Sequence, residues 1–189
     1  MDGRKIKKEF DGPIDNFILD YFIIPLDHIF YKLKFTPNII TTISLIFGLL
    51  SAYYLYNKSY ISIICLIIAY ILDGSDGYFA RKHNMVSKFG DYYDHISDYT
   101  KHLAIFYVMW ILDSNIFKKQ LFINFILILL MIYHLSLQEL IYNKKEESGI
   151  LNLINDYIEF NTDNIYWAKY FSCGTYLVYI ALLEYIYIL

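Results

Sequence analysis

The stretch LDGSDGYFARKHNMVSKFGDYYDHISD, residues 72–98, holds five aspartates between two apolar segments. Residues three and four positions apart share one face of a helix. Asp73 and Asp76 therefore share a face at the end of the first flanking helix, and Asp94 and Asp98 share a face at the start of the next. The link between them can fold the two helices back side by side. The sequence thus predicts that four carboxylates converge in a partly buried place.

The composition around this stretch indicates a membrane protein. Of the 189 residues, 57% are hydrophobic, whereas soluble domains have roughly 45–50% apolar residues. A spanning helix needs about 20 mostly apolar residues. Five segments approach that length: 39–56, 60–72, a segment that starts near 90 and ends with 103–112, then 120–142 and 165–189. We therefore predict an all-α, polytopic membrane bundle of five to six transmembrane helices.

An N-terminal arm precedes the bundle. Residues 16–34 mix apolar and charged side chains around Pro25, which is typical of an amphipathic helix lying on the membrane surface. An ordinary helix docked on the bundle is the alternative. Residues 150–160 are similar in character and predict an interfacial helix or a reduced extra span. We expect one domain over 1–189, with an interfacial arm at 1–35 and the transmembrane bundle at 36–189.

Charge gives the expected orientation and excludes one class of partner. Lys and Arg concentrate in the arm, in the link after the second span and after the fourth span, and such residues mark the cytoplasmic side. We therefore expect the N-terminus and the aspartate stretch to face the cytoplasm. The net charge of −3 gives no basic footprint for nucleic acid. Cys65 and Cys173 lie apart in apolar segments, so neither a disulfide framework nor a zinc site is predicted.

The convergent carboxylates need compensating charge, because repulsion and burial would otherwise neutralise them. Sites made only of oxygen ligands favour hard divalent cations such as Mg²⁺, Mn²⁺ or Ca²⁺. Between the acids, Gly77 and Ala80 leave room for a ligand to approach the helix, and Arg81 offers a fork suited to phosphate oxygens. This combination indicates phosphoryl-group chemistry at a metal site.

These residues also carry a family resemblance. The pattern D-x₂-D-G-x₂-A-R-x₈-G-x₃-D-x₃-D is met by Asp73, Asp76, Gly77, Ala80, Arg81, Gly90, Asp94 and Asp98. The chain therefore resembles the CDP-alcohol phosphotransferases, the class-I CDP-alcohol phosphatidyltransferase family. Thr36-Pro37-Asn38 followed by Thr41 is similar to that family's entry into its first transmembrane helix.

The resemblance implies a homodimeric membrane enzyme that transfers a phosphatidyl or phospho-alcohol group from a CDP-linked donor to a hydroxyl and releases CMP. It implies that Asp73, Asp76 and Asp94 bind a pair of Mg²⁺ or Mn²⁺ ions, and that Asp98 contacts metal and takes the proton of the attacking hydroxyl. It further implies that Gly77, Ala80 and Arg81 hold the cytidine and phosphates, with Asn38 and Thr41 reaching the nucleotide.

Two points stay open at this level. Lys101 follows Asp98 on the same stripe, so we predict a contact with an acceptor or lipid phosphate; a salt bridge with Asp98, or extension to the surface, is the alternative. The small size favours CDP-diacylglycerol as donor and a small alcohol as acceptor. The sister reaction, from CDP-choline or CDP-ethanolamine to diacylglycerol, is the alternative, because the sister group often has His after the third aspartate and His95 follows Asp94.

Two other classes of function compete. A divalent-cation transporter would place its carboxylates near the bilayer midplane, whereas these lie at one end of their helices beside Arg81. An inactive structural relative would be expected to lack a motif aspartate, and all four are present. The sequence therefore favours the enzyme.

Overall fold

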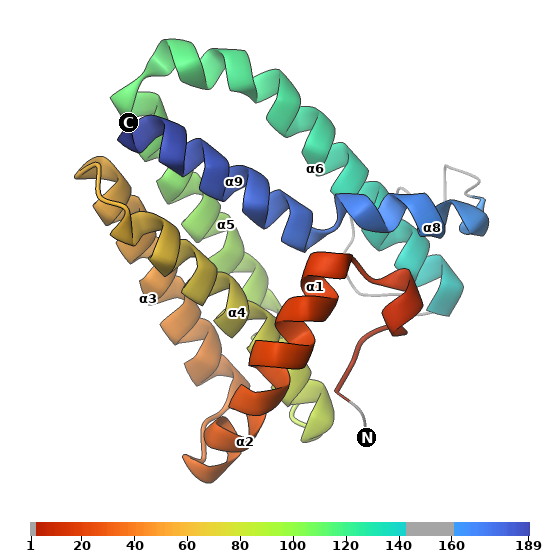
Figure 1. Ribbon diagram of the computed structural model, residues 1–189. Coiled ribbons are helices and arrows are strands. Elements are labelled where there is room, and N and C mark those ends of the chain that lie inside the picture. Colours follow the sequence, from red (N-terminus) through yellow and green to blue (C-terminus); the bar gives the residue numbers. More distant parts are fainter. Residues whose placement is uncertain (1–2, 143–160) are drawn as a thin grey trace.

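The structure, a computed structural model, describes residues 3–142 and 161–189, and all regular elements in these ranges are helical (Figure 1). The helices are α1 (Pro13–Ile18), α2 (Ile24–Lys32), α3 (Pro37–Tyr56), α4 (Ile61–Lys82), α5 (Lys88–Leu112), α6 (Ser114–Tyr142), α8 (Ile165–Ala168) and α9 (Cys173–Ile188). Short 3₁₀ turns occur at Lys8–Phe10, Thr162–Asn164 and Lys169–Phe171. The predicted all-α class is confirmed for these residues, and the helix predicted at 150–160 lies outside them.

Four helical segments in the described ranges are long and apolar enough to cross a membrane: Pro37–Tyr56, Ile61–Lys82, Ser114–Ile141 and Thr162–Ile188. The sequence predicted at least five. The difference is α5, which has 25 residues but carries the polar half of the aspartate stretch along its first turns. Its length therefore suffices for a span, while its composition does not mark it as one.

Helices α3, α4 and α5 lie side by side (Figure 1), and α3 packs against both of the others. Thr36 caps α3 by accepting a hydrogen bond from the Ile39 amide at 3.4 Å, and Pro37 occupies the first turn. Ser87 caps α5 in the same way through the Gly90 amide at 3.0 Å. Because α4 continues to Lys82 and α5 begins at Lys88, the link between them is short and spans residues 83–87.

The N-terminal arm follows a helical path from α1 through a π-helical turn at Leu19–Ile23 into α2, close to the predicted 16–34. Pro25 explains the wide turn: it has no amide hydrogen, and its ring would crowd the carbonyl four residues earlier in a regular helix. In the π turn the Ile24 amide bonds the Leu19 carbonyl instead. The arm buries Ile18 and Ile23 against α4 and α9.

Asp15 joins the arm to the bundle. Its Oδ1 accepts hydrogen bonds from the Tyr70 hydroxyl at 2.6 Å and from the Gly174 amide at 3.0 Å, and its Oδ2 accepts one from Ser172. The chain is extended at Ser172, with ψ 174°. The predicted span over 165–189 corresponds to the apolar segment Thr162–Ile188, but a bend at Ser172 divides it into α8 and α9, which meet at an angle (Figure 1).

The start of α6 also differs from the prediction of 120–142. Asp113 Oδ1 accepts hydrogen bonds from the amides of Asn115 at 2.8 Å and Ile116 at 3.0 Å. This cap starts the helix at Ser114, so Lys118 and Lys119 lie in its early turns rather than in a loop. Helix α9 packs with α3, α5 and α6, and the largest buried apolar cluster joins Leu55, Met109 and Ile180 from three of these helices.

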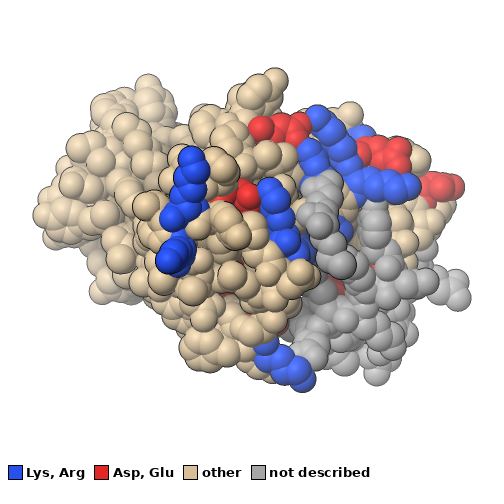
Figure 2. Space-filling view, turned by 90° about the horizontal axis from the view of Figure 1, so that it is seen from below, with Lys and Arg blue, Asp and Glu red and all other residues tan. Residues whose placement is uncertain are grey.

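Basic and acidic side chains gather on the lower face of the molecule, the end of the bundle where α2 and the α4–α5 link lie (Figures 1 and 2). In this view Lys and Arg side chains stand beside Asp and Glu, while one whole flank has neither (Figure 2). At this end Asp27 of α2 accepts from Lys82 at 2.6 Å and lies 2.9 Å from His83. The ion pair of Asp27 with Lys82 and its contact with His83 hold the end of α4 against the arm.

Candidate active site

Three of the four predicted carboxylates meet between α4 and α5. Asp73 from α4 and Asp94 and Asp98 from α5 each offer one ligand atom, and these atoms all lie within 4.8 Å of one another. Asp94 and Asp98 share a helical face, as their spacing of four predicts. Helix α3 packs against both α4 and α5, and this arrangement brings the carboxylates of the two helices together.

Asp76, the fourth carboxylate, lies beside this group and outside it. Its side chain is buried, and its Oδ2 accepts a hydrogen bond from the Thr41 hydroxyl of α3. Thr41 is likewise buried at the start of α3. Helix α3 thus orients Asp76, and it brings Thr41 to the site, as the sequence predicted.

The residues present suit a hard divalent cation. All the offered ligands are carboxylate oxygens, which Mg²⁺ and Mn²⁺ prefer. Asp94 Oδ1 is buried and has no hydrogen-bond partner within the described part of the chain. A buried carboxylate oxygen without a partner is costly unless a cation compensates it. The acidic group therefore has the ligands that a divalent metal ion prefers, and Asp94 Oδ1 is a buried atom that such an ion would compensate.

A cavity of about 640 Å³ adjoins the carboxylates. It is lined by the motif residues Asp76, Gly77, Ala80, Arg81, Gly90 and Asp94, and by Asn38 and Thr41 at the start of α3. The structure therefore brings together the residues that the sequence predicted to hold cytidine and phosphates. Their individual roles stay predictions.

Close contacts explain the two motif glycines. A Cβ on Gly77 would lie 3.0 Å from the Arg81 guanidinium, which packs over this position, so a larger residue would push Arg81 aside. A Cβ on Gly90 would lie 3.2 Å from Asn38 Oδ1. Arg81 Nε also donates to the Gly3 carbonyl of the arm at 2.9 Å. Both glycines thus keep polar side chains close to the cavity wall.

Lys101 bridges the two acidic helices. Its Nζ lies 2.5 Å from Asp73 Oδ1 and 2.7 Å from Asp98 Oδ1, and it donates to Ser44 Oγ at 3.0 Å. The ion pair with Asp98, the alternative from the sequence, is therefore present together with one to Asp73. The phosphate contact predicted for Lys101 stays a prediction.

Comparison with known proteins agrees with this geometry. The sequence model of a family described as CDP-alcohol phosphatidyltransferase matches residues 34–183. The chain belongs to this family. The match covers α3 to α9 up to residue 183 and includes every motif residue, and the family uses a divalent metal. As a family member, the chain is a multi-pass integral membrane protein.

Two curated relatives are the CDP-diacylglycerol–serine O-phosphatidyltransferases of Helicobacter pylori strains ATCC 700392 / 26695 and J99 / ATCC 700824. Each is 38% identical to this chain over 63 residues, which is 33% of this chain and 27% of the relative. The chain thus matches about a quarter of the length of these relatives.

Sequence reasoning missed two elements that contribute to this cavity, helix α6 and the N-terminal arm. Leu135 and Glu139 of α6 line it, as does Lys5 of the arm. A carboxylate within an apolar span is a signal for Glu139, but the motif gives no reason to bring α6 to α4. Asp91, the fifth aspartate of residues 72–98 and outside the motif, lies in the first turn of α5 and also lines the cavity.

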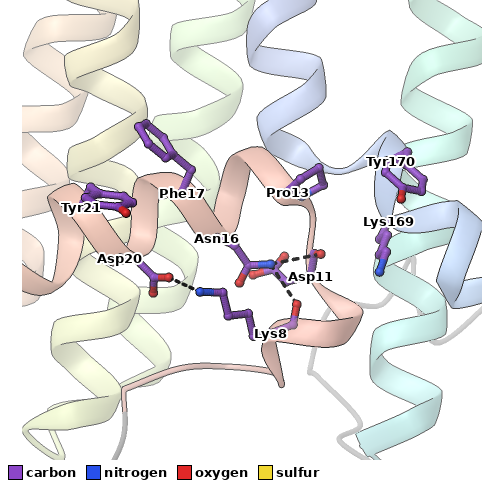
Figure 3. A pocket seen from close by; sticks show the side chains of 9 residues that line it. All are labelled: Lys8, Asp11, Pro13, Asn16, Phe17, Asp20, Tyr21, Lys169 and Tyr170. Atoms are coloured by element: carbon purple, nitrogen blue, oxygen red, sulfur yellow. Dashed lines mark hydrogen bonds and ion pairs between the residues drawn. The ribbon is translucent and has the colours of Figure 1, made fainter.

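A second cavity, of about 430 Å³, lies under the N-terminal arm (Figure 3). It is lined by Lys8, Asp11, Pro13, Asn16, Phe17, Asp20, Tyr21, Lys169 and Tyr170, none of which belongs to the family motif. Burial, with the nearby charge of Asp15, raises the pKa of Asp11 to about 6. Hydrogen bonds from Lys8 and Arg4 lower the pKa of Asp20. This cavity lies where the arm meets the bundle, and it is separate from the carboxylate site.

Proposed function

We propose that this chain transfers a phosphatidyl group from CDP-diacylglycerol to the hydroxyl of a small alcohol and releases CMP. The observation that carries the proposal is the meeting of Asp73, Asp94 and Asp98 beside a cavity lined by the remaining motif residues. The volume of about 640 Å³ lies within the roughly 300–1,000 Å³ of ligand pockets. The family membership supports the same reaction class.

In this proposal Asp73, Asp76 and Asp94 hold two Mg²⁺ or Mn²⁺ ions. Bound divalent ions would neutralise the diphosphate and stabilise the charge on CMP as it leaves. Arg81, beside Gly77, holds phosphate oxygens, while Ala80, Asn38 and Thr41 shape the nucleotide end of the cavity.

Asp98 is the proposed general base. It takes the proton of the acceptor hydroxyl, whose oxygen then forms a bond to the phosphorus that carries the diacylglycerol. The bond from this phosphorus to the oxygen shared with CMP breaks, and CMP leaves with that oxygen. Asp98 is well placed because its side chain is 39% exposed, against 26% for Asp73. A base must reach an incoming substrate.

Serine is the first acceptor to test, because the curated relatives carry serine in their names. The sister reaction, in which CDP-choline or CDP-ethanolamine donates to diacylglycerol, is the second candidate. His95 lines the cavity next to Asp94, which is the observation in its favour. The donor that supports CMP release distinguishes the two reactions.

We further infer that α5 is a fifth span, that the arm lies at the cytoplasmic membrane surface and that the protein is a homodimer. The basic side chains of the arm and of the α4–α5 link support this orientation. The exposed aromatic side chains of Phe17, Tyr21 and Phe22 on the arm support contact with the membrane interface.

The experiment is CMP release from the detergent-solubilised protein with CDP-diacylglycerol, Mg²⁺ or Mn²⁺, and a panel of alcohols headed by serine. We expect metal-dependent CMP release with at least one alcohol. Asp98→Asn should abolish turnover, by at least about 100-fold, and leave binding of the CDP donor largely intact. Asp163→Asn is the matched control, because Asp163 is exposed in the Thr162–Asn164 turn.

Two outcomes would contradict the proposal. Full activity of Asp98→Asn would remove Asp98 as the base. Absence of metal-dependent CMP release with every donor and acceptor, including CDP-choline and CDP-ethanolamine with diacylglycerol, would contradict the enzyme itself.

A further inference from the structure

Lys101 binds the same carboxylates that are proposed for the metal site. Its side chain is only 8% exposed, and its ammonium group lies between Asp73 of α4 and Asp98 of α5. Asp73 and Asp98 belong to the group whose ligand atoms lie within 4.8 Å of one another. A cation of the chain itself therefore already occupies part of the coordination space of that group.

Helix α3 holds this lysine in a notch. A Cβ on Gly48 would lie 2.4 Å from Lys101 Cγ and 2.6 Å from its Cδ, so the lysine stem crosses α3 where a side chain is missing. One turn earlier, Ser44 Oγ accepts from Lys101 Nζ at 3.0 Å and donates to the Ala69 carbonyl at 2.9 Å. The second bond orients the lone pairs of Ser44 toward the lysine. Neither Gly48 nor Ser44 belongs to the family motif.

The notch makes Lys101 a fixed charge rather than a surface lysine. A free lysine can extend to water, but this stem is enclosed by α3 and the ammonium has three oxygen partners, which matches its three N–H donors. Its positive charge holds Asp73 and Asp98 together when no metal is bound. The same charge repels a divalent ion at the site, because like charges a few ångströms apart interact strongly in a partly buried place.

We propose that Lys101 is a positioning residue, a built-in counter-cation that competes with a divalent metal ion for Asp73 and Asp98 and so lowers the affinity of the site for metal. This inference rests on the proposed function only in taking the carboxylates as metal ligands. It adds a determinant of metal affinity from outside the motif and does not depend on the identity of the acceptor.

The test is Mn²⁺ binding by the purified full chain in detergent, without nucleotide, measured by electron paramagnetic resonance of the free ion. Lys101→Met should bind Mn²⁺ roughly tenfold more tightly or better, because the competing charge is gone. Lys101→Arg, which keeps the charge, should not gain affinity. The matched control is Lys118→Met, at an exposed position in α6, which should bind as the wild type does.

Gly48→Ala is a second variant that keeps the lysine and displaces its stem, and it should tighten Mn²⁺ binding in the same direction. Unchanged or weaker Mn²⁺ binding by folded Lys101→Met would overturn the inference. So would an increase in the acceptor KM with unchanged Mn²⁺ affinity, since that result assigns the lysine to substrate. Tighter Mn²⁺ binding without CMP release from any substrate would contradict the proposed function and leave this inference standing.

Discussion

Burial in the docked arm makes the ionised form of the Asp11 carboxyl group unfavourable. Burial, supported by the charge of Asp15, raises its pKa from the ordinary value of 3.8 to about 6. A carboxyl group with a raised pKa binds its proton more tightly in the folded state. The contribution of Asp11 to the stability of the docked arm should therefore be greatest below about pH 4, fall as the pH rises toward 6, and level off above it.

Asp11→Asn tests this dependence. The neutral amide can still accept the hydrogen bond that the Gly12 amide donates to Asp11 Oδ1 at 2.9 Å. At pH 7.5 the variant should unfold at a higher temperature than the wild type. Its free energy of unfolding should be greater by at most about 3 kcal/mol. The difference should shrink as the pH falls through 6 toward 4.5. A variant that unfolds like the wild type at every pH would contradict the cost of this charge.

Single residues were predictable wherever a fixed spacing defined them. The aspartates, Gly77 and Arg81 follow from the motif, and Asn38 and Thr41 from the family resemblance at the start of α3. Asp73, Asp94 and Asp98 lie together, and Gly77, Arg81, Asn38 and Thr41 line the adjoining cavity. Of the groups that contact Lys101, only Asp98 could be predicted from the sequence. Its spacing to Asp98 is local, whereas Asp73 and the notch at Gly48 come from other helices and depend on the packing of three helices.

Helices α3, α4 and α9 are joined by one buried carboxyl group. Glu184 of α9 is fully buried; its Oε1 accepts from Ser51 of α3 at 2.8 Å and its Oε2 accepts from Ser62 of α4. Buried polar groups are costly without partners. This contact therefore fixes how α9 lies against the other two helices.

Glu184→Ala should lower the free energy of unfolding by about 1–3 kcal/mol, because two buried serine hydroxyls lose their acceptor. Glu184→Gln, which retains an acceptor oxygen, should lose less. The measurement is thermal unfolding in detergent, with Mn²⁺ affinity as the readout that should not change. Equal stability of Glu184→Ala and the wild type would show that the contact contributes nothing.

The ends of helices were harder to predict than their existence. Apolar runs located the four membrane-length segments of the described residues. However, α6 begins before 120 because Asp113 caps it, and the last segment breaks at Ser172 because Asp15 binds there. The first signal is local and could be recognised from the sequence. The second joins positions 157 apart in the chain, and no local pattern encodes it.

Basic and acidic side chains gather at the end of the molecule where α2 and the α4–α5 link lie (Figure 2), and this distribution predicts the orientation in the membrane. Asn57, just after α3, is exposed and lies at the opposite end of α3 from the cavity. A cysteine in place of Asn57 should react with a membrane-impermeant maleimide in intact cells. A cysteine in place of Lys7, an exposed residue of the arm, should react only after permeabilisation.

The native cysteines should interfere little, since Cys65 is buried and Cys173 is partly buried. The unsubstituted protein is the control for their background. Labelling at position 7 in intact cells, with none at 57, would reverse the proposed orientation.

The notch on α3 has a consequence for natural sequence variation. A side chain added at position 48 would occupy the volume of the Lys101 stem, so a related protein that keeps lysine at 101 is confined to glycine at 48. A relative that loses the lysine is free to enlarge position 48 and fill the space. The two positions should therefore vary together among homologues, although 48 does not line the cavity at the carboxylates and lies outside the family motif.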